Sequence, residues 1–219
     1  MTDVSTVSAR SVIVISSHVA HGSVGNRSIV FALETLGFPV WAVPTVILPW
    51  RPDRGRATRI VPDTKLFADF LKDLENFPRL NEVGAVISGY LGDAGQAAAI
   101  ASLVARLRSV NPRLRYLCDP VIGDSDGLYV PEKTAEAIRD RLVPLADIVT
   151  PNRFELAWMA GLPLDDVEAI IAAASALPRE AVAPKMALVT SAPGGSAGRI
   201  GNLLVTGSAA VLVDHIMLG

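Results

Sequence analysis

The chain alternates short apolar runs with polar residues, and several of these runs end in side chains that can bind phosphate, metal or an aromatic ring. The first run, VIVI at residues 12–15, leads directly into SSHVAHGSVGN at residues 16–26. Consecutive β-branched residues predict a strand that is buried on both faces, as in a parallel sheet. We expect the polar and glycine-rich segment after it to form a loop.

This loop has the composition of an anion-binding turn. Gly22 and Gly25 permit positive φ or a close approach of the backbone. Asn26 is a good N-cap for a helix over Arg27–Leu36, which Gly37 ends. A strand, a glycine loop and a helix N-terminus in this order present backbone N–H groups to an anion.

Strand and helix patterns alternate along most of the chain. Further strands are predicted over Val40–Val43, Ala85–Ile87, Leu114–Cys118, Asp147–Val149 and Met186–Val189. Helices are predicted over Asp63–Phe77, Ala94–Val110, Pro131–Leu142, Arg153–Ala160 and Asp165–Ala176. The segments Arg199–Val205 and Ala209–Asp214 are typical of a hairpin. The order predicts a single α/β domain over 1–219, with a mostly parallel central sheet and helices on both faces.

Polar residues gather where the predicted strands end. In open α/β sheets, ligands bind beyond the carboxyl ends of the strands. The residues at those ends are Ser16, Ser17, His18, Thr45, the segment SGYLGD at residues 88–93, Asp119, Thr150, Thr190 and Ser191. The sequence therefore predicts one ligand site along this edge of the sheet.

Composition narrows the class of protein. The chain has 219 residues, 50% hydrophobic and 19% charged, with a net charge of −2. Its basic residues form no run, which argues against a nucleic-acid partner. The apolar runs are far shorter than a membrane span, and residues 1–10 lack a secretory apolar region, so we expect a cytoplasmic protein without a membrane partner. The one cysteine, Cys118, ends an apolar run and is expected to be a buried hydrophobe.

Asp119 and Glu155 are candidate metal ligands. A carboxylate at the end of a buried strand is costly unless a cation or several donors compensate it, and Mg²⁺ bound to a phosphorylated substrate would do so. Asp119 could instead form an Asx-turn. Asn152 and Glu155 have the spacing of a capping box, which is compatible with a metal role.

Ser17 and Tyr90 are candidates for holding a flat ring, Tyr90 by stacking and Ser17 by hydrogen bonding. Tyr90 could also be a partly buried loop aromatic. The Gly194-Gly195 pair is expected to be a surface turn, because no Lys-Ser/Thr or helix follows it. The chain carries neither a Walker sequence nor a dinucleotide fingerprint.

In these motifs the chain resembles the pyridoxal kinases, a branch of the ribokinase-like superfamily. SHVAHGSVGN resembles the opening S-H-V-x-x-G-x-V-G-N of that family, and SGYLGD, CDPVIGD, YVPE, ADIVTPNRFE and the LVTS run follow in the same order. The resemblance extends from about Val12 to Thr206. It implies a ribokinase-like fold and transfer of the ATP γ-phosphoryl group to the 5′-hydroxymethyl of pyridoxal, pyridoxine or pyridoxamine in vitamin B6 salvage.

By position, the resemblance assigns residues to two parts of a site. The vitamer would be bound by Ser17, Val46, Tyr90 and Tyr129. The nucleotide region would contain Asp119, Asp124, Thr150, Glu155 and Thr190, with Mg²⁺ served by Asp119 and, through water, by Glu155. The resemblance also implies ATP as co-substrate, a monovalent cation (K⁺ or Na⁺) near Thr150, and a homodimer.

The sequence departs from the family pattern in two places. Pro52 replaces a threonine of the loop S-N-H-T-G-Y, and Arg51, Arg54 and Arg56 make this loop more basic. The late G-x-G-D motif, whose glycines form an anion hole and whose Asp is the catalytic base, is not found before Gly219. No catalytic residue is therefore assigned within residues 1–219, the ribokinase-like domain is expected to lack its C-terminal part, and impaired phosphorylation is expected.

Two other functions stay open on the sequence. One is a non-catalytic protein that binds a vitamer or a nucleotide. The other is a different ribokinase-like kinase, such as one acting on hydroxymethylpyrimidine. The SHVxxG opening and the CDPVIGD motif favour a pyridoxal kinase over this alternative.

Overall fold

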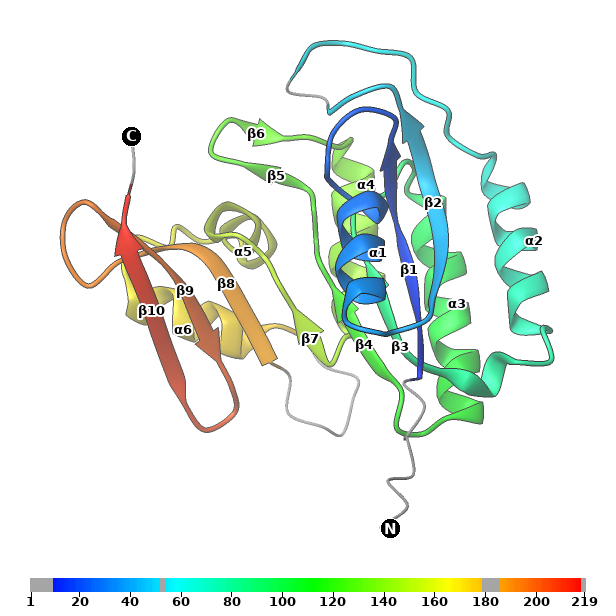
Figure 1. Ribbon diagram of the computed structural model, residues 1–219. Coiled ribbons are helices and arrows are strands. Elements are labelled where there is room, and N and C mark those ends of the chain that lie inside the picture. The colour runs from blue at the N-terminus through cyan, green and yellow to red at the C-terminus, as the bar shows by residue number, and fades with distance from the viewer. Residues whose placement is uncertain (1–9, 52–53, 179–185, 218–219) are drawn as a thin grey trace.

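The computed structural model describes residues 10–51, 54–178 and 186–217, and within them one eight-stranded sheet runs through the molecule (Figure 1). The strands are β1 (Ser11–Val19), β2 (Val40–Leu48), β3 (Val83–Ser88), β4 (Arg115–Cys118), β7 (Ile148–Val149), β8 (Met186–Pro193), β9 (Arg199–Val205) and β10 (Ala210–Ile216). Their order across the sheet is β10-β9-β8-β7-β4-β3-β1-β2. From β2 to β8 all neighbours are parallel, and β9 and β10 are added antiparallel. The predicted mostly parallel sheet and closing hairpin are confirmed.

Helices lie on both faces of this sheet. Helix α1 (Asn26–Thr35) packs on β1 and β2 at the front of Figure 1, and α3 (Gly95–Val110) lies on the other side with α2 (Thr64–Glu75) against it. Helix α4 (Glu132–Ala137) continues into a π-helical turn, Ile138–Leu142, and α6 (Val167–Ala176) packs on β8 and β9. Helix α5 (Arg153–Ala160) starts directly after β7. No helix among the described residues is long and apolar enough to span a lipid bilayer.

The centre of the sheet forms the core. Ile13, Ile15 and Val86 are fully buried, as are Ile100 and Leu103 of α3. Tyr116 is also fully buried, and its hydroxyl lies 2.7 Å from Oγ of Ser88 on the neighbouring strand, so this polar pair is satisfied inside the apolar core. Cys118 is buried, as expected.

The N-terminus of α1 differs from the sequence prediction. The N-cap is Gly25, which has a φ of 57°, and Asn26 is the first helical residue. Asn26 is buried, and its Oδ1 has no hydrogen-bond partner within the described residues. A β-carbon on Gly25 would overlap the backbone oxygen and the Oγ of Ser17, so glycine is required by both conformation and space. The N-cap assignment to Asn26 was wrong because the close approach places the boundary one residue earlier.

Strand β2 is longer than predicted because it continues through Pro44. It is the edge strand of the sheet, so the missing N–H of proline can face away from the ladder. The extension carries Thr45 and Val46 to the carboxyl edge of the sheet.

The Gly194-Gly195 pair lies in the turn between β8 and β9, before the closing hairpin of β9 and β10, as predicted. The backbone N–H of Gly195 donates to Oδ2 of Asp214 at 2.7 Å, and Arg199 donates to Oδ1 of the same carboxylate at 2.7 Å. These bonds lower the pKa of Asp214 to about 2, with the Arg199 hydrogen bond as the largest cause. The turn therefore fixes β9 against β10.

Burial of α3 against the sheet makes a specific stability prediction. Leu103 on α3 is fully buried, whereas Leu66 on α2 is 64% exposed. We expect Leu103→Ala to lower the free energy of unfolding by about 2–5 kcal/mol, because it removes buried methyl groups and leaves a cavity. The matched control Leu66→Ala should change it by less than about 0.5 kcal/mol. Urea unfolding measures both, and equal effects would contradict the assigned packing.

Candidate functional site

The polar residues predicted to share one edge of the sheet do lie along it. The sheet register pairs Ile15 with Ser88, and Ser88 with Cys118, so the residues after these positions leave neighbouring strands together. The backbone N–H of Asp119 donates to the carbonyl of Ser88 at 2.8 Å, and that of Thr150 donates to the carbonyl of Cys118 at 3.1 Å. The carboxyl ends of β1, β3, β4 and β7 are thus held in one row.

Asp119 and Thr150 are in direct contact. The hydroxyl of Thr150 donates to Oδ1 of Asp119 at 3.0 Å. Burial raises the pKa of Asp119, and the Thr150 hydrogen bond partly opposes this rise. Within the described residues only Oδ1 of this carboxylate accepts a side-chain hydrogen bond, so Oδ2 can meet a cation.

Glu155 forms the predicted capping box and also reaches the loop after Asp119. Its Oε2 accepts from the backbone N–H of Asn152 at 2.8 Å, and Asn152 Oδ1 accepts from the backbone N–H of Glu155 at 2.9 Å. Its Oε1 accepts from the backbone N–H of Ile122 at 3.0 Å and of Gly123 at 3.4 Å. One buried carboxylate therefore fixes the start of α5 and the CDPVIGD loop.

The environment of Glu155 favours its protonated form. Its side chain is 4% exposed, and this burial raises the pKa to about 7 although the backbone hydrogen bonds lower it. The negative charge of Asp119 raises the pKa further, which places the two carboxyl groups in one electrostatic environment. A bound cation would favour the ionised form of both groups.

The small hairpin of β5 (Gly123–Asp124) and β6 (Gly127–Leu128) brings together Asp124 and Tyr129. The Tyr129 hydroxyl donates to Asp124, and this bond is the largest cause that lowers the pKa of Asp124. The hairpin lies over the same edge of the sheet in Figure 1. Tyr129 is 48% exposed, so its ring remains accessible at the mouth of the site.

Thr190 lies at the start of α5. It forms a parallel bridge with Asn152, and its backbone N–H donates to the carbonyl of Pro151 at 3.0 Å. The next residue, Ser191, has a φ of 57°, which is strained for a residue with a side chain. β8 is irregular between Val189 and Ala192, and this irregularity turns the strand beside the helix N-terminus.

The ring-binding candidates lie at the other end of the row. Ser17 is buried at the end of β1, beside Gly25. The carbonyl of Tyr90 accepts from the Thr45 hydroxyl at 2.6 Å, and Gln96 Nε2 donates to the carbonyl of Thr45 at 2.8 Å. Val46 is fully buried beneath this loop, so its side chain forms part of the floor.

Sequence reasoning missed Arg59, which lies on Tyr90. Its guanidinium carbon is 6.0 Å from the centre of the Tyr90 ring, and its Nη2 donates to the Tyr90 hydroxyl at 3.3 Å. Tyr90 is 9% exposed. Arg59 lies in a loop without hydrophobic periodicity, so only the separate arginines at positions 51, 54 and 56 pointed to this region.

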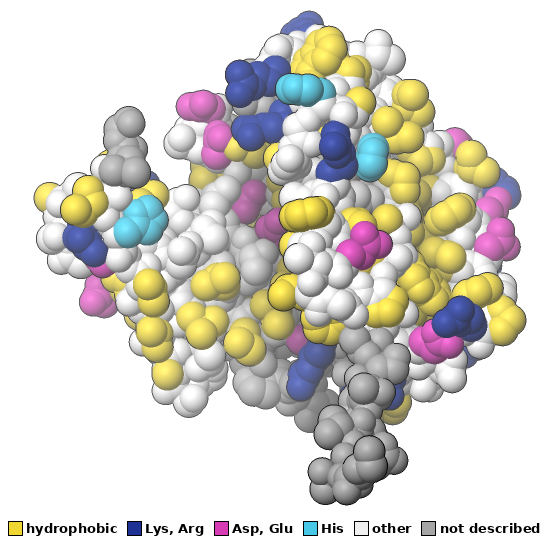
Figure 2. Space-filling model, viewed as in Figure 1, with side chains coloured by type: hydrophobic (Ala, Val, Ile, Leu, Met, Phe, Trp, Pro, Cys, Tyr) yellow, Lys and Arg dark blue, Asp and Glu magenta, His cyan; other side chains and the backbone are white. Residues whose placement is uncertain are grey.

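The acidic groups suit a metal that is bound together with a nucleotide. No cluster of three or more His, Cys, Asp or Glu side chains able to hold a metal occurs in the part of the chain that is described. Asp119 and Glu155 supply two carboxylates, and Mg²⁺ commonly uses one or two carboxylates with waters and substrate phosphates. Figure 2 shows acidic side chains in the recess between α1 and the β9–β10 hairpin.

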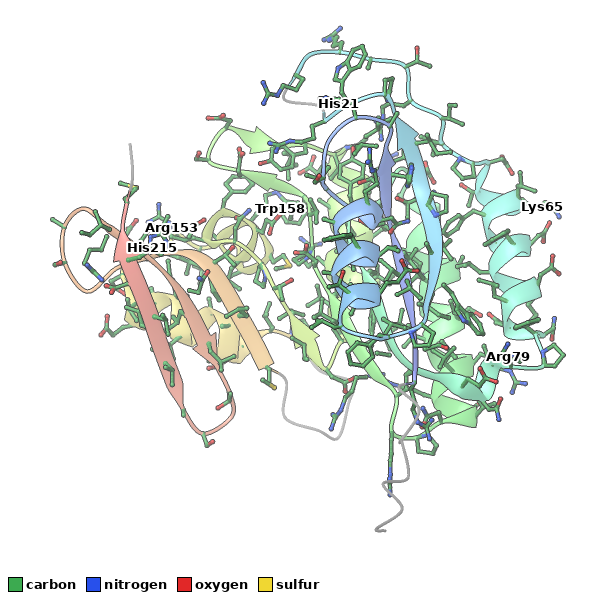
Figure 3. All side chains as sticks on the ribbon, viewed as in Figure 1. His21, Lys65, Arg79, Arg153, Trp158 and His215 are labelled. Carbon is green, nitrogen blue, oxygen red and sulfur yellow. The ribbon has the colours of Figure 1, made fainter. Side chains whose placement is uncertain are left out.

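Two partly open pockets lie at the opposite edge of the sheet. One has a volume of about 470 Å³ and is lined by residues that include Ser11, Trp41 and Arg79, and the other, of about 840 Å³, is lined by Arg115 and Asp147 among others. In Figure 3, Arg79 lies at the end of the molecule opposite His21, which marks the loop after β1. These pockets are remote from the row of polar residues, which lies in an open recess.

Comparison with known proteins gives consistent matches. Residues 72–216 match the family model described as phosphomethylpyrimidine kinase. The pyridoxal kinase PdxY of Rubrobacter xylanophilus is 38% identical over 208 residues, which cover 93% of this chain and 71% of that protein. The pyridoxal kinase PdxY of Corynebacterium diphtheriae is 35% identical over 179 residues, which cover 81% of this chain and 62% of that protein.

The structural comparison agrees. The pyridoxal kinase of Leishmania donovani in complex with ADP and pyridoxamine superimposes with a TM-score of 0.83 at 26% sequence identity, covering 94% of this chain and 72% of that one. The chain thus spans 62% to 71% of the length of the two curated relatives described above. These matches cover most of the described fold, including the carboxyl edge of the sheet. They show that the chain belongs to the pyridoxal kinase family and has a ribokinase-like fold.

Proposed function

We propose that the protein transfers the γ-phosphoryl group of ATP to the 5′-hydroxymethyl group of pyridoxal or a related vitamer. The observation that carries this proposal is the single row of groups at the carboxyl edge of the sheet. Ser17 and Tyr90 lie at one end of it, and Asp119, Thr150 and Glu155 lie at the other. Such a row suits a ring and a triphosphate that meet between its ends.

The acidic end would hold the nucleotide phosphates with Mg²⁺. Asp119 would meet the cation through its Oδ2, and Glu155, whose oxygens accept backbone hydrogen bonds, would act through water. Mg²⁺ would neutralise charge that develops on the transferring phosphoryl group. Thr190 and the N-terminus of α5 would lie beside the nucleotide, and Asp124 would serve the same region.

The other end would hold the vitamer. Ser17 would hydrogen-bond the ring, Tyr90 would stack on it, and Val46 would support this loop from below. Tyr129, held by Asp124 on the small hairpin, would close over the space between vitamer and nucleotide. This arrangement would orient the substrate hydroxyl towards the phosphate and exclude water.

The proton acceptor is not assigned to any carboxylate of residues 1–219. The resemblance places that role on the Asp of a late G-x-G-D motif, and these residues contain no such motif. Positioning and electrostatic stabilisation supply most of the catalysis of phosphoryl transfer, so we expect the 219-residue polypeptide to bind its ligands more readily than it turns them over.

Three further features belong to this proposal. A monovalent cation, K⁺ or Na⁺, would lie near Thr150. A homodimer would cover exposed apolar side chains, of which Phe31 and Leu36 at α1 are 73% and 72% exposed. A cytoplasmic location stays a prediction from composition.

A coupled assay of ADP release tests the function directly. We expect slow but measurable turnover with pyridoxal, ATP and Mg²⁺, and a lower rate with hydroxymethylpyrimidine, which the phosphomethylpyrimidine kinase match makes the second candidate. Faster turnover of the pyrimidine would reverse the two assignments. Vitamer or nucleotide binding measured by calorimetry without any ADP release would favour a non-catalytic binding protein.

The raised pKa of Glu155 predicts a pH dependence of metal binding. Between pH 6 and 8 the ionised fraction of a group with a pKa of about 7 rises about tenfold, so MgADP affinity should rise with pH. Glu155→Gln should flatten this rise, while a glutamine can keep part of the capping box. ADP titrated without Mg²⁺ is the control, and an unchanged pH profile in the variant would contradict the assignment.

The raised pKa of Glu155 also predicts how the stability of the metal-free protein depends on pH. Glu155 keeps its proton up to about pH 7 in the folded protein, but only up to about pH 4.5 in the unfolded chain. Protonation of Glu155 therefore stabilises the folded protein fully at low pH, and this stabilisation is lost as pH rises from 4.5 to about 7. The free energy of unfolding should fall by up to about 3 kcal/mol across this window. Glu155→Gln should remove most of this slope in urea unfolding.

The contact between Gly25 and Ser17 predicts a selective loss of vitamer binding. Gly25→Ala should displace Ser17 and weaken binding of pyridoxine about tenfold, because one hydrogen bond to the ring is lost. Gly37→Ala is the matched control, since Gly37 also has a positive φ of 84° but no atom lies within 4 Å of an added β-carbon. Gly25→Ala should also lose more stability than Gly37→Ala, because only the β-carbon at position 25 meets other atoms. Equal affinities of the two folded variants in calorimetry would refute the role of Ser17.

A further inference from the structure

The guanidinium of Arg59 lies against the ring of Tyr90, a contact that the family resemblance does not predict. Its guanidinium lies over this ring, and Nη2 donates to the Tyr90 hydroxyl at 3.3 Å and to the carbonyl of Gly92 at 3.4 Å. Both distances are near the upper limit for a hydrogen bond, so these contacts are weak. Arg59 is itself exposed at the mouth of the recess.

The charge of Arg59 is not neutralised within the described residues. No carboxylate forms an ion pair with it, and its hydrogen bonds reach only a hydroxyl and a carbonyl. The acidic residue of the neighbouring loop, Asp93, uses its Oδ1 to accept from the Thr64 hydroxyl and from the backbone N–H of Gly95. Several donor groups of the guanidinium therefore remain for a ligand.

The surroundings of Arg59 are also basic. The exposed cationic or titratable side chains near the carboxyl ends of β1 and β2 are His18 on β1, His21, Arg27 on α1, Arg51, Arg54 and Arg56. Figure 2 shows dark blue basic and cyan histidine side chains gathered at the top of the molecule, above the recess. Such a rim attracts anions and disfavours cations.

We propose that Arg59 is a specificity-determining residue that binds an anionic oxygen carried by the aromatic substrate. This inference rests on the proposed function, because it assumes that the substrate ring stacks on Tyr90. The ring would take the place of the guanidinium on Tyr90, and the guanidinium would move to the negative substituent of that ring. A charge-assisted hydrogen bond is stronger than the exposed cation–π contact that it replaces.

Two substrates supply the required chemistry. A B6 vitamer carries an ionised phenolic oxygen on the ring carbon meta to the ring nitrogen, and a phosphomethylpyrimidine carries a phosphate on its methylene group. Both place a negative oxygen at the edge of a flat heteroaromatic ring. A neutral ring of the same shape has no such group and should not respond to Arg59.

Matched ligand pairs separate these sources. Calorimetry with the full 219-residue chain would compare pyridoxine with 3-deoxypyridoxine, and phosphomethylpyrimidine with hydroxymethylpyrimidine. The alcohols avoid aldehyde chemistry with lysine. The variants are Arg59→Gln, Arg59→Lys and the control Arg113→Gln, which removes an exposed charge beyond the opposite edge of the sheet.

We expect Arg59→Gln to weaken the anionic member of at least one pair about tenfold and to leave its neutral partner within about twofold. Arg59→Lys should recover part of the loss, and Arg113→Gln should bind like the unmodified chain. A loss for pyridoxine alone identifies the phenolic oxygen, and a loss for phosphomethylpyrimidine alone identifies the phosphate.

Equal losses for charged and neutral members would overturn the inference, because Arg59 would then only support Tyr90. No loss for any ligand would overturn it as well. If the unmodified chain binds none of the four ring compounds, the proposed function fails with it. Thermal unfolding of each variant would show whether a loss reflects a damaged fold.

Discussion

The carboxylate of Glu155 joins three backbone N–H groups from two separate segments. It caps α5 through Asn152, and it accepts from Ile122 and Gly123 in the loop after Asp119. This carboxylate joins the two segments together with Asn152, whose Nδ2 donates to the carbonyl of Gly123 at 2.8 Å, and with the contact of Thr150 and Asp119. The acidic end of the site therefore depends on one buried side chain whose hydrogen bonds offset the cost of burying a charge.

The fold could be predicted from the sequence because its determinants are local. The β-branched run at residues 12–15 predicts the first strand, the alternation of strands and helices predicts the parallel sheet, and the segments Arg199–Val205 and Ala209–Asp214 predict the hairpin. The common edge of the polar residues then follows from parallel topology, since consecutive parallel strands end on the same side of a sheet. The capping box at Asn152 and Glu155 was also predictable, because its spacing is fixed by the first turn of the helix.

The features that the sequence did not reveal depend on contacts between distant segments. Asn26 was interpreted as an N-cap, but the approach of Gly25 to Ser17 moved the helix start, and no local pattern encodes that approach. Arg59 meets Tyr90 across 31 residues of chain, and it lies in a loop where side-chain direction has no period. Likewise, β2 continues through Pro44 because it is an edge strand, which is a property of the whole sheet.

The hydroxyl pair of Ser88 and Tyr116 has a consequence for how this family member can vary. The two oxygens are 2.7 Å apart inside an otherwise apolar layer, directly before the Gly89-Tyr90 turn. Changing Tyr116 alone removes the partner of the Ser88 hydroxyl, and changing Ser88 alone leaves the Tyr116 hydroxyl with only the weak thiol partner Cys118. An apolar pair of similar volume could replace both hydroxyls. Residues 88 and 116 should therefore co-vary among relatives. A chain in which only one of them changes should have an altered Gly89-Tyr90 turn.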